Sequence, residues 1–339
     1  VMDGKIFGRG ACDDKGSMLT PIIAFETLMQ LQNHLPINIK FLFEGQEEIS
    51  SPQMPDFVKK NKKKLSCDML FSADGGQWSE TQPEVVVALK GILGFELQIT
   101  GPKSDQHSGL QGGAIANPLM ALCQVISSMK DEQGKITIDG FYDDVLELSI
   151  EERTEISKIP FSDDDYRKEM DVDALFGEQG FSTLERMWAR PTLDVNGIWG
   201  GFQGDGTKTV LPSKAYAKIT CRLVANQDPE KVFDLIKTHV IAKCPTGVKL
   251  VINEYPGSGT PFRVPKNHDA TKIVKEVLKE VYNKEPYITR VGGSIPIISI
   301  FLKELGVHTA MLAFGLSDEN IHAPNEFFRL SSFKKGQLA

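Results

Sequence analysis

The chain has 339 residues, a net charge of −7 and a pI near 5.5. This balance argues against nucleic acid as a main partner, because phosphate binding requires concentrated Lys and Arg. No apolar run approaches the roughly 18 residues of a membrane span, so no membrane partner is expected. A chain of this length usually forms two domains.

The five cysteines are odd in number, widely spaced and never arranged as C-x-x-C. This usage is typical of free thiols in a reducing compartment rather than of disulfides or a thiolate zinc site. We therefore expect a cytoplasmic protein.

The first part of the chain alternates strands and helices. Apolar residues at helical or strand spacing predict a strand at 5–7, a helix at 17–33, a strand at 38–43, a helix at 55–64 and a strand at 68–73. Strands of near-continuous apolar character that alternate with helices favour a parallel sheet covered on both faces.

The pattern changes near Val85. We expect strands at 85–89 and 94–100, a helix at 115–129, an irregular acidic stretch at 131–190, a strand at 215–224, a helix at 229–240 and a strand at 248–254. The simplest arrangement is an inserted α+β domain, a sheet with two helices on one face.

The α/β pattern then resumes with helices at 270–282 and 295–305, the second closed by Gly306, a strand at 308–314 and a final helix from 333. The predicted fold class is α/β, with a mainly parallel sheet covered by helices. The predicted domains are 1–92 together with 266–339, interrupted by the insert at 93–265.

Acidic residues follow four of the expected strands. They lie in Asp13-Asp14, in Glu44-Gly45-Gln46-Glu47-Glu48, at Asp74, and in the stretch from Asp318 to His322. Because ligands bind beyond the carboxyl ends of parallel strands, these loops should meet at one edge of the sheet. So many carboxylates repel one another unless cations lie among them, and oxygen and nitrogen ligands suit Zn²⁺, Mn²⁺ or Co²⁺. The residues alone leave the reaction open.

Four motifs resemble those of the M20 metallopeptidases. They are Gly8-Arg9-Gly10-Ala11-Cys12-Asp13-Asp14-Lys15-Gly16, Glu44-Gly45-Gln46-Glu47-Glu48, His107-Ser108-Gly109 and Gly292-Gly293-Ser294-Ile295-Pro296. The resemblance covers essentially the whole chain and is greatest to the dipeptidase branch, which includes the carnosinases and the cytosolic nonspecific dipeptidases.

The resemblance implies two divalent metal ions, Zn²⁺ first, with Mn²⁺ or Co²⁺ as alternatives. It implies that Asp13 bridges the metals and that Asp14 follows across a cis peptide bond. Glu48 and Asp74 would each bind one metal, and His322 would be a further ligand. Glu47 would be the general base, taking a proton from the attacking water and passing it to the leaving amine.

The resemblance also implies roles for the insert, which would be a lid and dimerisation domain. His107 would reach the active site of the partner subunit in a homodimer and stabilise the developing oxyanion. Arg222 and Ser294 would hold the terminal carboxylate of a small peptide substrate. Thr209 and Asn117 are weaker candidates for substrate binding, with ordinary loop and helix-cap roles as the alternative.

The family pattern includes one more metal ligand, a histidine in an H-x-D motif before the first strand, yet no histidine precedes His34. We therefore expect that the sequence lacks an N-terminal segment. The leading hypothesis is metal-dependent hydrolysis of a peptide bond in dipeptides or short peptides. The alternatives are an N-acyl or N-carbamoyl amino-acid amidohydrolase on the same fold and a catalytically incomplete dimeric fragment.

Overall fold

The structure, a computed structural model, describes residues 1–265 and 267–339. The helical segments are η1 (Ala11–Gly16), α1 (Ser17–Gln32), η2 (Glu47–Ile49), α2 (Met54–Lys60), α3 (Lys62–Leu65), α4 (Ser108–Gln111), α5 (Pro118–Ser127), α6 (Ile150–Ser157), α7 (Asp163–Glu169), α8 (Thr183–Ala189), α9 (Pro229–Lys243), α10 (Asp269–Tyr282), α11 (Pro296–Leu305) and α12 (Leu330–Leu338). The strands are β1 (Lys5–Phe7), β2 (Leu70–Ser72), β3 (Glu84–Leu89), β4 (Gly91–Thr100), β5 (Gln106–His107), β6 (Thr192–Gly200), β7 (Val210–Leu211), β8 (Lys214–Leu223), β9 (Lys249–Glu254), β10 (Phe262–Arg263), β11 (Tyr287–Val291), β12 (Thr309–Met311) and β13 (Phe327–Arg329).

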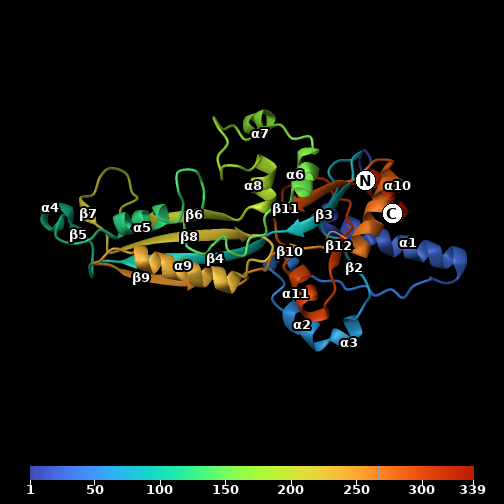
Figure 1. Cartoon of the computed structure of the whole chain (residues 1–339), viewed down its shortest axis with the longest axis horizontal. Helices are drawn as coiled ribbons and strands as arrows, with labels where there is room; N and C mark the ends of the chain where they lie inside the picture. Colours follow the sequence, from blue (N-terminus) through green and yellow to red (C-terminus); the bar gives the residue numbers. More distant parts are fainter. Residues whose placement is uncertain (266) are drawn as a thin grey trace.

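An antiparallel sheet of order β6-β8-β4-β9 occupies one end of the elongated molecule (Figure 1). Along β4 the side chains alternate between buried and partly exposed, so that Leu93, Phe95, Leu97 and Ile99 all face one side with no exposed surface. That side packs against α5 and α9 in a single apolar core. The predicted α+β insert, a sheet with two helices on one face, is confirmed.

Parallel strand pairs form the other end of the molecule. β3 pairs with β11 and β2 pairs with β12, both in parallel, while β10 adds to β3 in the antiparallel sense. The apolar stripe of α10, which includes Val274 and Leu278, packs with Val85 of β3 and Ala310 of β12. α11 packs in a neighbouring cluster that includes Leu89 and Met311, so the predicted α/β class is confirmed.

The chain passes between the two ends at adjacent points. β3 leads into β4 through Lys90, and the return segment pairs at the bridge Ile92–Gly259. A Cβ atom on Gly91 would overlap the carbonyl oxygen of Gly259. Glycine is therefore needed here, because the two crossing segments approach backbone to backbone.

The predicted strand at 38–43 is wrong. Within residues 1–265 and 267–339 no strand pairs with this stretch, although its sequence is apolar. Its side chains are largely exposed, with Phe41 at 47% and Phe43 at 57%, and the two rings stack on each other. Strand propensity depends on a neighbouring strand and a covered face, and the described residues supply neither here.

The prediction that residues 131–190 are irregular is also wrong, because α6, α7 and α8 lie there. Ser149, Ser162 and Ser182 cap the three helices through their hydroxyl groups. The caps of α6 and α8 are full capping boxes, because Glu152 and Glu185 also accept a hydrogen bond from the backbone amide of the cap residue. Of these helices, α6 and α8 lie beside β11, and α7 lies farther out at the edge of the molecule (Figure 1).

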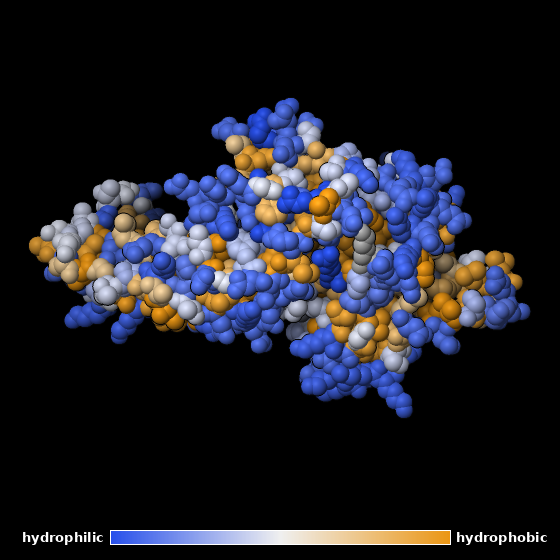
Figure 2. Space-filling view, in the orientation of Figure 1, coloured by the Kyte–Doolittle hydropathy of each residue, from blue (hydrophilic) through white to orange (hydrophobic). Residues whose placement is uncertain are grey.

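No helix in the described part of the chain is long and apolar enough to span a membrane. The surface is largely hydrophilic in the view of Figure 2, with apolar residues where α1 reaches the edge of the molecule. Leu28, Met29 and Leu31 of α1 are exposed there.

Leu97→Ala should destabilise the insert by about 2–5 kcal/mol, because it leaves a cavity in a core with no exposed surface. Val251→Ala on the neighbouring strand β9, where the side chain is 45% exposed, should change the stability by no more than about 0.5 kcal/mol. Chemical denaturation of both variants measures the difference, and equal losses would contradict the assigned core.

Candidate active site

Four loops bring the predicted acidic residues to one region. Asp13 and Asp14 lie in η1 after β1, and the peptide bond between them is cis, as the resemblance implied. Glu47 and Glu48 form the start of η2. Asp74 follows β2, and the loop after β12 carries His322.

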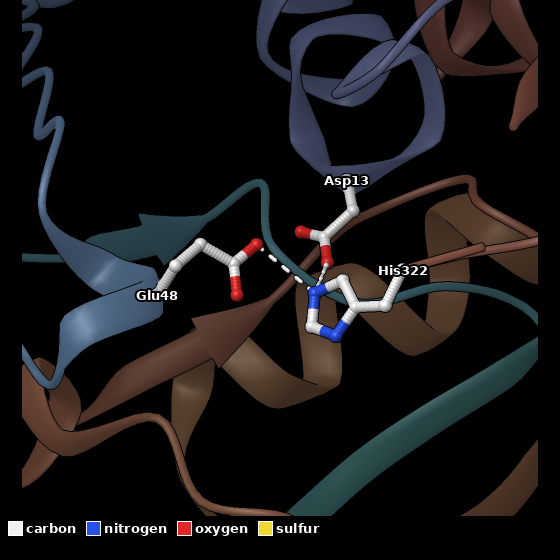
Figure 3. A group of neighbouring side chains, drawn as sticks. All are labelled: Asp13, Glu48 and His322. Atoms are coloured by element: carbon white, nitrogen blue, oxygen red, sulfur yellow. Dashed lines mark hydrogen bonds and ion pairs between the residues drawn. The ribbon is translucent and has the colours of Figure 1, made fainter. Parts of the chain in front are cut away.

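Asp13, Glu48 and His322 converge (Figure 3). The Nε2 atom of His322 lies 3.0 Å from Oδ2 of Asp13 and 3.0 Å from Oε1 of Glu48. One ligand atom from each residue lies within 4.8 Å of the other two. A divalent ion with bonds of about 2.0–2.2 Å fits a group of this size and composition.

The carboxylates of this region disfavour one another's ionisation. Burial raises the pKa of Asp74 to about 7, and the negative charges of Asp13, Glu47, Asp14 and Glu48 add to the effect. Burial, followed by the charge of neighbouring carboxylates, also raises the pKa values of Asp13, Asp14 and Glu47.

His322 supplies the one opposite charge within the converging group. Its pKa is raised by the hydrogen bond to Glu48 and the charge of Glu48, and further by Asp13. A protonated imidazole between two carboxylates occupies the position that suits a metal cation. The donor set of carboxylate oxygens and one imidazole therefore fits a divalent metal, and Asp74 and Glu47 add negative charge around it.

A second polar group lies near the junction of the two ends of the molecule. The guanidinium of Arg222 on β8 donates to Oγ of Ser294 at 3.1 Å, and Ser294 donates in turn to the carbonyl oxygen of Lys90. Lys90 is buried, and this burial lowers the pKa of its ammonium group to about 8. Within the described ranges, Arg222 forms no ion pair with a carboxylate. The structure thus brings the predicted substrate-binding residues Arg222 and Ser294 together, near the ammonium group of Lys90.

His107 and Thr209 lie far from this region. β5, which contains His107, is at the opposite end of the molecule from α1 and the N-terminus (Figure 1). His107 is exposed and pairs with Val210, and the amide of Ser108 donates to the carbonyl oxygen of Thr209 at 3.0 Å. The structure therefore places these two residues together, but not beside the acidic residues of the same chain.

Asn117 caps α5. Its Oδ1 atom accepts a hydrogen bond from the amide of Leu119 at 2.9 Å. The helix-cap alternative for Asn117 is therefore observed, and its role in substrate binding stays a prediction.

Residues 1–338 match the family model of peptidase family M20/M25/M40. The chain belongs to peptidase family M20. It is 32% identical to the Cys-Gly metallodipeptidase of Schizosaccharomyces pombe, a match that covers 98% of this chain and 71% of the relative. It is 30% identical to the Beta-Ala-His dipeptidase of Rattus norvegicus, with 96% of this chain and 67% of the relative covered.

Solved structures agree with this M20 assignment. The M20 family metallo-carboxypeptidase Sso-CP2 of Sulfolobus solfataricus superimposes with a TM-score of 0.86 at 32% identity, covering all of this chain and 76% of that one. Human carnosine dipeptidase 1 superimposes with a TM-score of 0.75 at 28% identity, covering all of this chain and 73% of that one. The chain is a metallopeptidase, and M20 metallopeptidases use divalent metals.

Two buried carboxylates of this M20 peptidase were not predicted as individual site residues. Glu319 has no exposed surface and Glu326 has 2%, and both contact the loop that carries Asp13. The available signal was their position, since both lie within four residues of the predicted ligand His322.

Without metal, this M20 peptidase should lose stability as the pH rises from about 5 to about 8. Burial raises the pKa of Asp74 in the folded state to about 7, above its ordinary value of 3.8, so the native state binds more protons than the unfolded state in this range. The stability that protonated Asp74 contributes is present at low pH and is lost as the pH rises through about 7. The raised pKa of His322 acts in the same direction.

The melting temperature of chelator-treated protein, measured against pH, tests this expectation. Asp74→Asn should have a shallower slope, because the titrating group is gone. Identical slopes for the two proteins would show that Asp74 is not the group responsible.

Proposed function

We propose that this M20 peptidase hydrolyses the peptide bond of dipeptides or short peptides in a reaction that depends on two divalent metal ions. The single observation that supports it most is the convergence of Asp13, Glu48 and His322. The names of the relatives, a Cys-Gly metallodipeptidase and a Beta-Ala-His dipeptidase, favour small peptides as the substrate class.

The proposed metal ligands are Asp13, Glu48, Asp74 and His322, with Asp13 between the two ions. Zn²⁺ suits carboxylate and imidazole donors best, and Mn²⁺ or Co²⁺ are alternatives. When bound, such ions polarise the scissile carbonyl group and lower the pKa of the attacking water.

Glu47 is the proposed general base. It adjoins Glu48 in η2, and the negative charges of Glu48 and Asp13 add to burial in raising its pKa. A carboxylate with a raised pKa is a stronger base and can keep the proton until it passes to the leaving amine. Glu48 is the less suitable neighbour for this role, because its oxygen faces His322 at 3.0 Å.

The substrate carboxylate is proposed to bind at Arg222 and Ser294. A guanidinium that lacks a carboxylate partner in the described ranges is available to a carboxylate ligand, and buried Lys90 adds positive charge nearby. Thr209 and Asn117 are proposed as further substrate contacts, and Thr209 would act together with His107 at the tip of the insert.

The insert at 93–265 is proposed as a lid and dimerisation domain on a catalytic domain formed by 1–92 and 266–339. The boundary residue 266 lies outside the described residues. The distance between β5 and the acidic residues of the same chain supports a homodimer in which His107 serves the partner subunit. All five cysteines are free, which is consistent with a cytoplasmic location.

Glu47→Gln should keep its metal and lose turnover by about 10²- to 10⁴-fold, because the amide cannot accept the proton. Glu132→Gln, a change at an exposed loop position, is the control and should leave turnover unchanged. Metal analysis and turnover of a dipeptide panel, with N-acyl amino acids included, are the measurements. Turnover retained by Glu47→Gln would exclude it as the base. Faster wild-type turnover of the N-acyl substrates would favour the amidohydrolase alternative.

Arg222→Gln should raise KM about 10- to 100-fold for peptides with a free terminal carboxylate, since a hydrogen bond to a charged group contributes about 1.5–3 kcal/mol. Peptides with an amidated end should be far less affected. Lys218→Gln is the matched control, because it removes a positive charge four residues earlier on the same face of β8. Equal effects of the two substitutions would indicate a general charge effect rather than a carboxylate site.

A further inference from the structure

Glu326 joins the two loops that carry Asp13 and His322. It lies four residues after His322, and its side chain has only 1% of its surface exposed. One carboxylate oxygen accepts hydrogen bonds from the amides of Cys12 at 2.9 Å and Asp13 at 3.1 Å. The other oxygen accepts from the amide of Gly10 at 2.9 Å.

The backbone of the Asp13 loop is shaped to present these amides. Gly10 has φ +76°, a left-handed conformation that favours glycine, and it precedes the turn in which the amides of Cys12 and Asp13 face the carboxylate. A buried carboxylate is costly unless its oxygens receive hydrogen bonds. Arg9 compensates the charge weakly, because its guanidinium is 3.5 Å away and its side chain is 65% exposed. The three amides are thus the principal partners of Glu326.

Glu319 supports the same loops from a second side. It accepts hydrogen bonds from the amides of Leu316 and Arg329, both at 2.9 Å, and from the thiol of Cys12 at 3.0 Å. Glu319 and Glu326, which lie on either side of His322, therefore both form hydrogen bonds with Cys12, the residue that precedes Asp13.

We propose that Glu326 is a positioning residue that sets the metal affinity of the site by fixing the backbone of Asp13 relative to His322. The inference rests on the proposed metal centre. Groups that orient metal ligands typically change metal affinity 10- to 100-fold when they are removed. Glu326 acts through the amides of the loop, because its buried carboxylate accepts hydrogen bonds from three backbone amides and is not among the side chains that converge at the candidate metal site.

Glu326→Gln tests this proposal. The substitution keeps the volume of the side chain, but a carboxamide has one acceptor oxygen, and its NH2 group would face an amide donor. The Asp13 loop should therefore shift, and Zn²⁺ should bind about 10- to 100-fold more weakly than to the wild-type chain.

Glu185→Gln is the matched control. Glu185 is also buried, with 5% of its surface exposed. Its carboxylate accepts a hydrogen bond from the backbone amide of Ser182 at 2.8 Å and forms an ion pair with Arg153. It lies in α8 and contacts no predicted metal ligand. Both substitutions should lower the melting temperature, whereas only Glu326→Gln should weaken Zn²⁺ binding; the control should change the affinity less than about twofold.

The measurement is titration of Zn²⁺ into the metal-free full chain in competition with a chromophoric chelator. Wild-type affinity for Zn²⁺ in folded Glu326→Gln overturns the positioning role and leaves the proposed function intact. Failure of the wild-type chain itself to bind Zn²⁺ overturns the proposed metal centre and the inference with it. If Glu326→Gln does not fold, Glu326→Asp is measured in its place. The shorter side chain keeps the charge but moves the carboxylate oxygens away from the backbone amides of the Asp13 loop. The same two outcomes then decide the proposal.

Discussion

Repulsion among carboxylates at one edge of the fold is the constraint on which the rest of the structure depends. Asp13, Asp14, Glu47, Glu48 and Asp74 are brought together by loops that are far apart in the sequence. Burial raises the pKa of Asp74 to about 7, and the negative charges of the neighbouring carboxylates add to this effect when no cation is bound. A protein retains so unfavourable a cluster where cations offset the charge, which is the physical basis for a metallopeptidase site.

Hydrogen bonds between buried carboxylates and backbone amides hold the loops of the site in place against this repulsion. Glu319 and Glu326 are themselves buried carboxylates, but backbone amides satisfy their oxygens, so they stabilise the loops instead of adding to the unpaired charge. The insert contributes Arg222 at the junction, where close approach at Gly91 leaves little space between the crossing segments. Metal site and junction thus both depend on contacts between segments distant in sequence.

Much of the fold could be predicted from the sequence, because periodicity reports which face is buried. The alternation along β4 and the apolar stripe of α10 are local patterns, and both elements formed as predicted. The stretch at 38–43 shows the limit of this reasoning, since a strand also requires a neighbour. The helices at 131–190 were missed although the Ser149 and Ser182 capping boxes are a readable local signal.

The metal-binding candidates were predictable as residue types in ordered motifs, and the structure brings three of them, Asp13, Glu48 and His322, together. The role of Glu326 was not predictable, because it depends on three amides more than 300 positions away in the chain. Local patterns carry no information about which backbone groups a distant carboxylate will meet.

The most direct test of the proposed metal centre is a crystal structure of the chain grown with Zn²⁺, with anomalous scattering to locate the ion. We expect an ion about 2.0–2.2 Å from a carboxylate oxygen of Asp13, with Glu48 or His322 as a further ligand. The absence of Zn²⁺ at this position, with His322 keeping its 3.0 Å contacts to Asp13 and Glu48, would contradict the proposed metal centre.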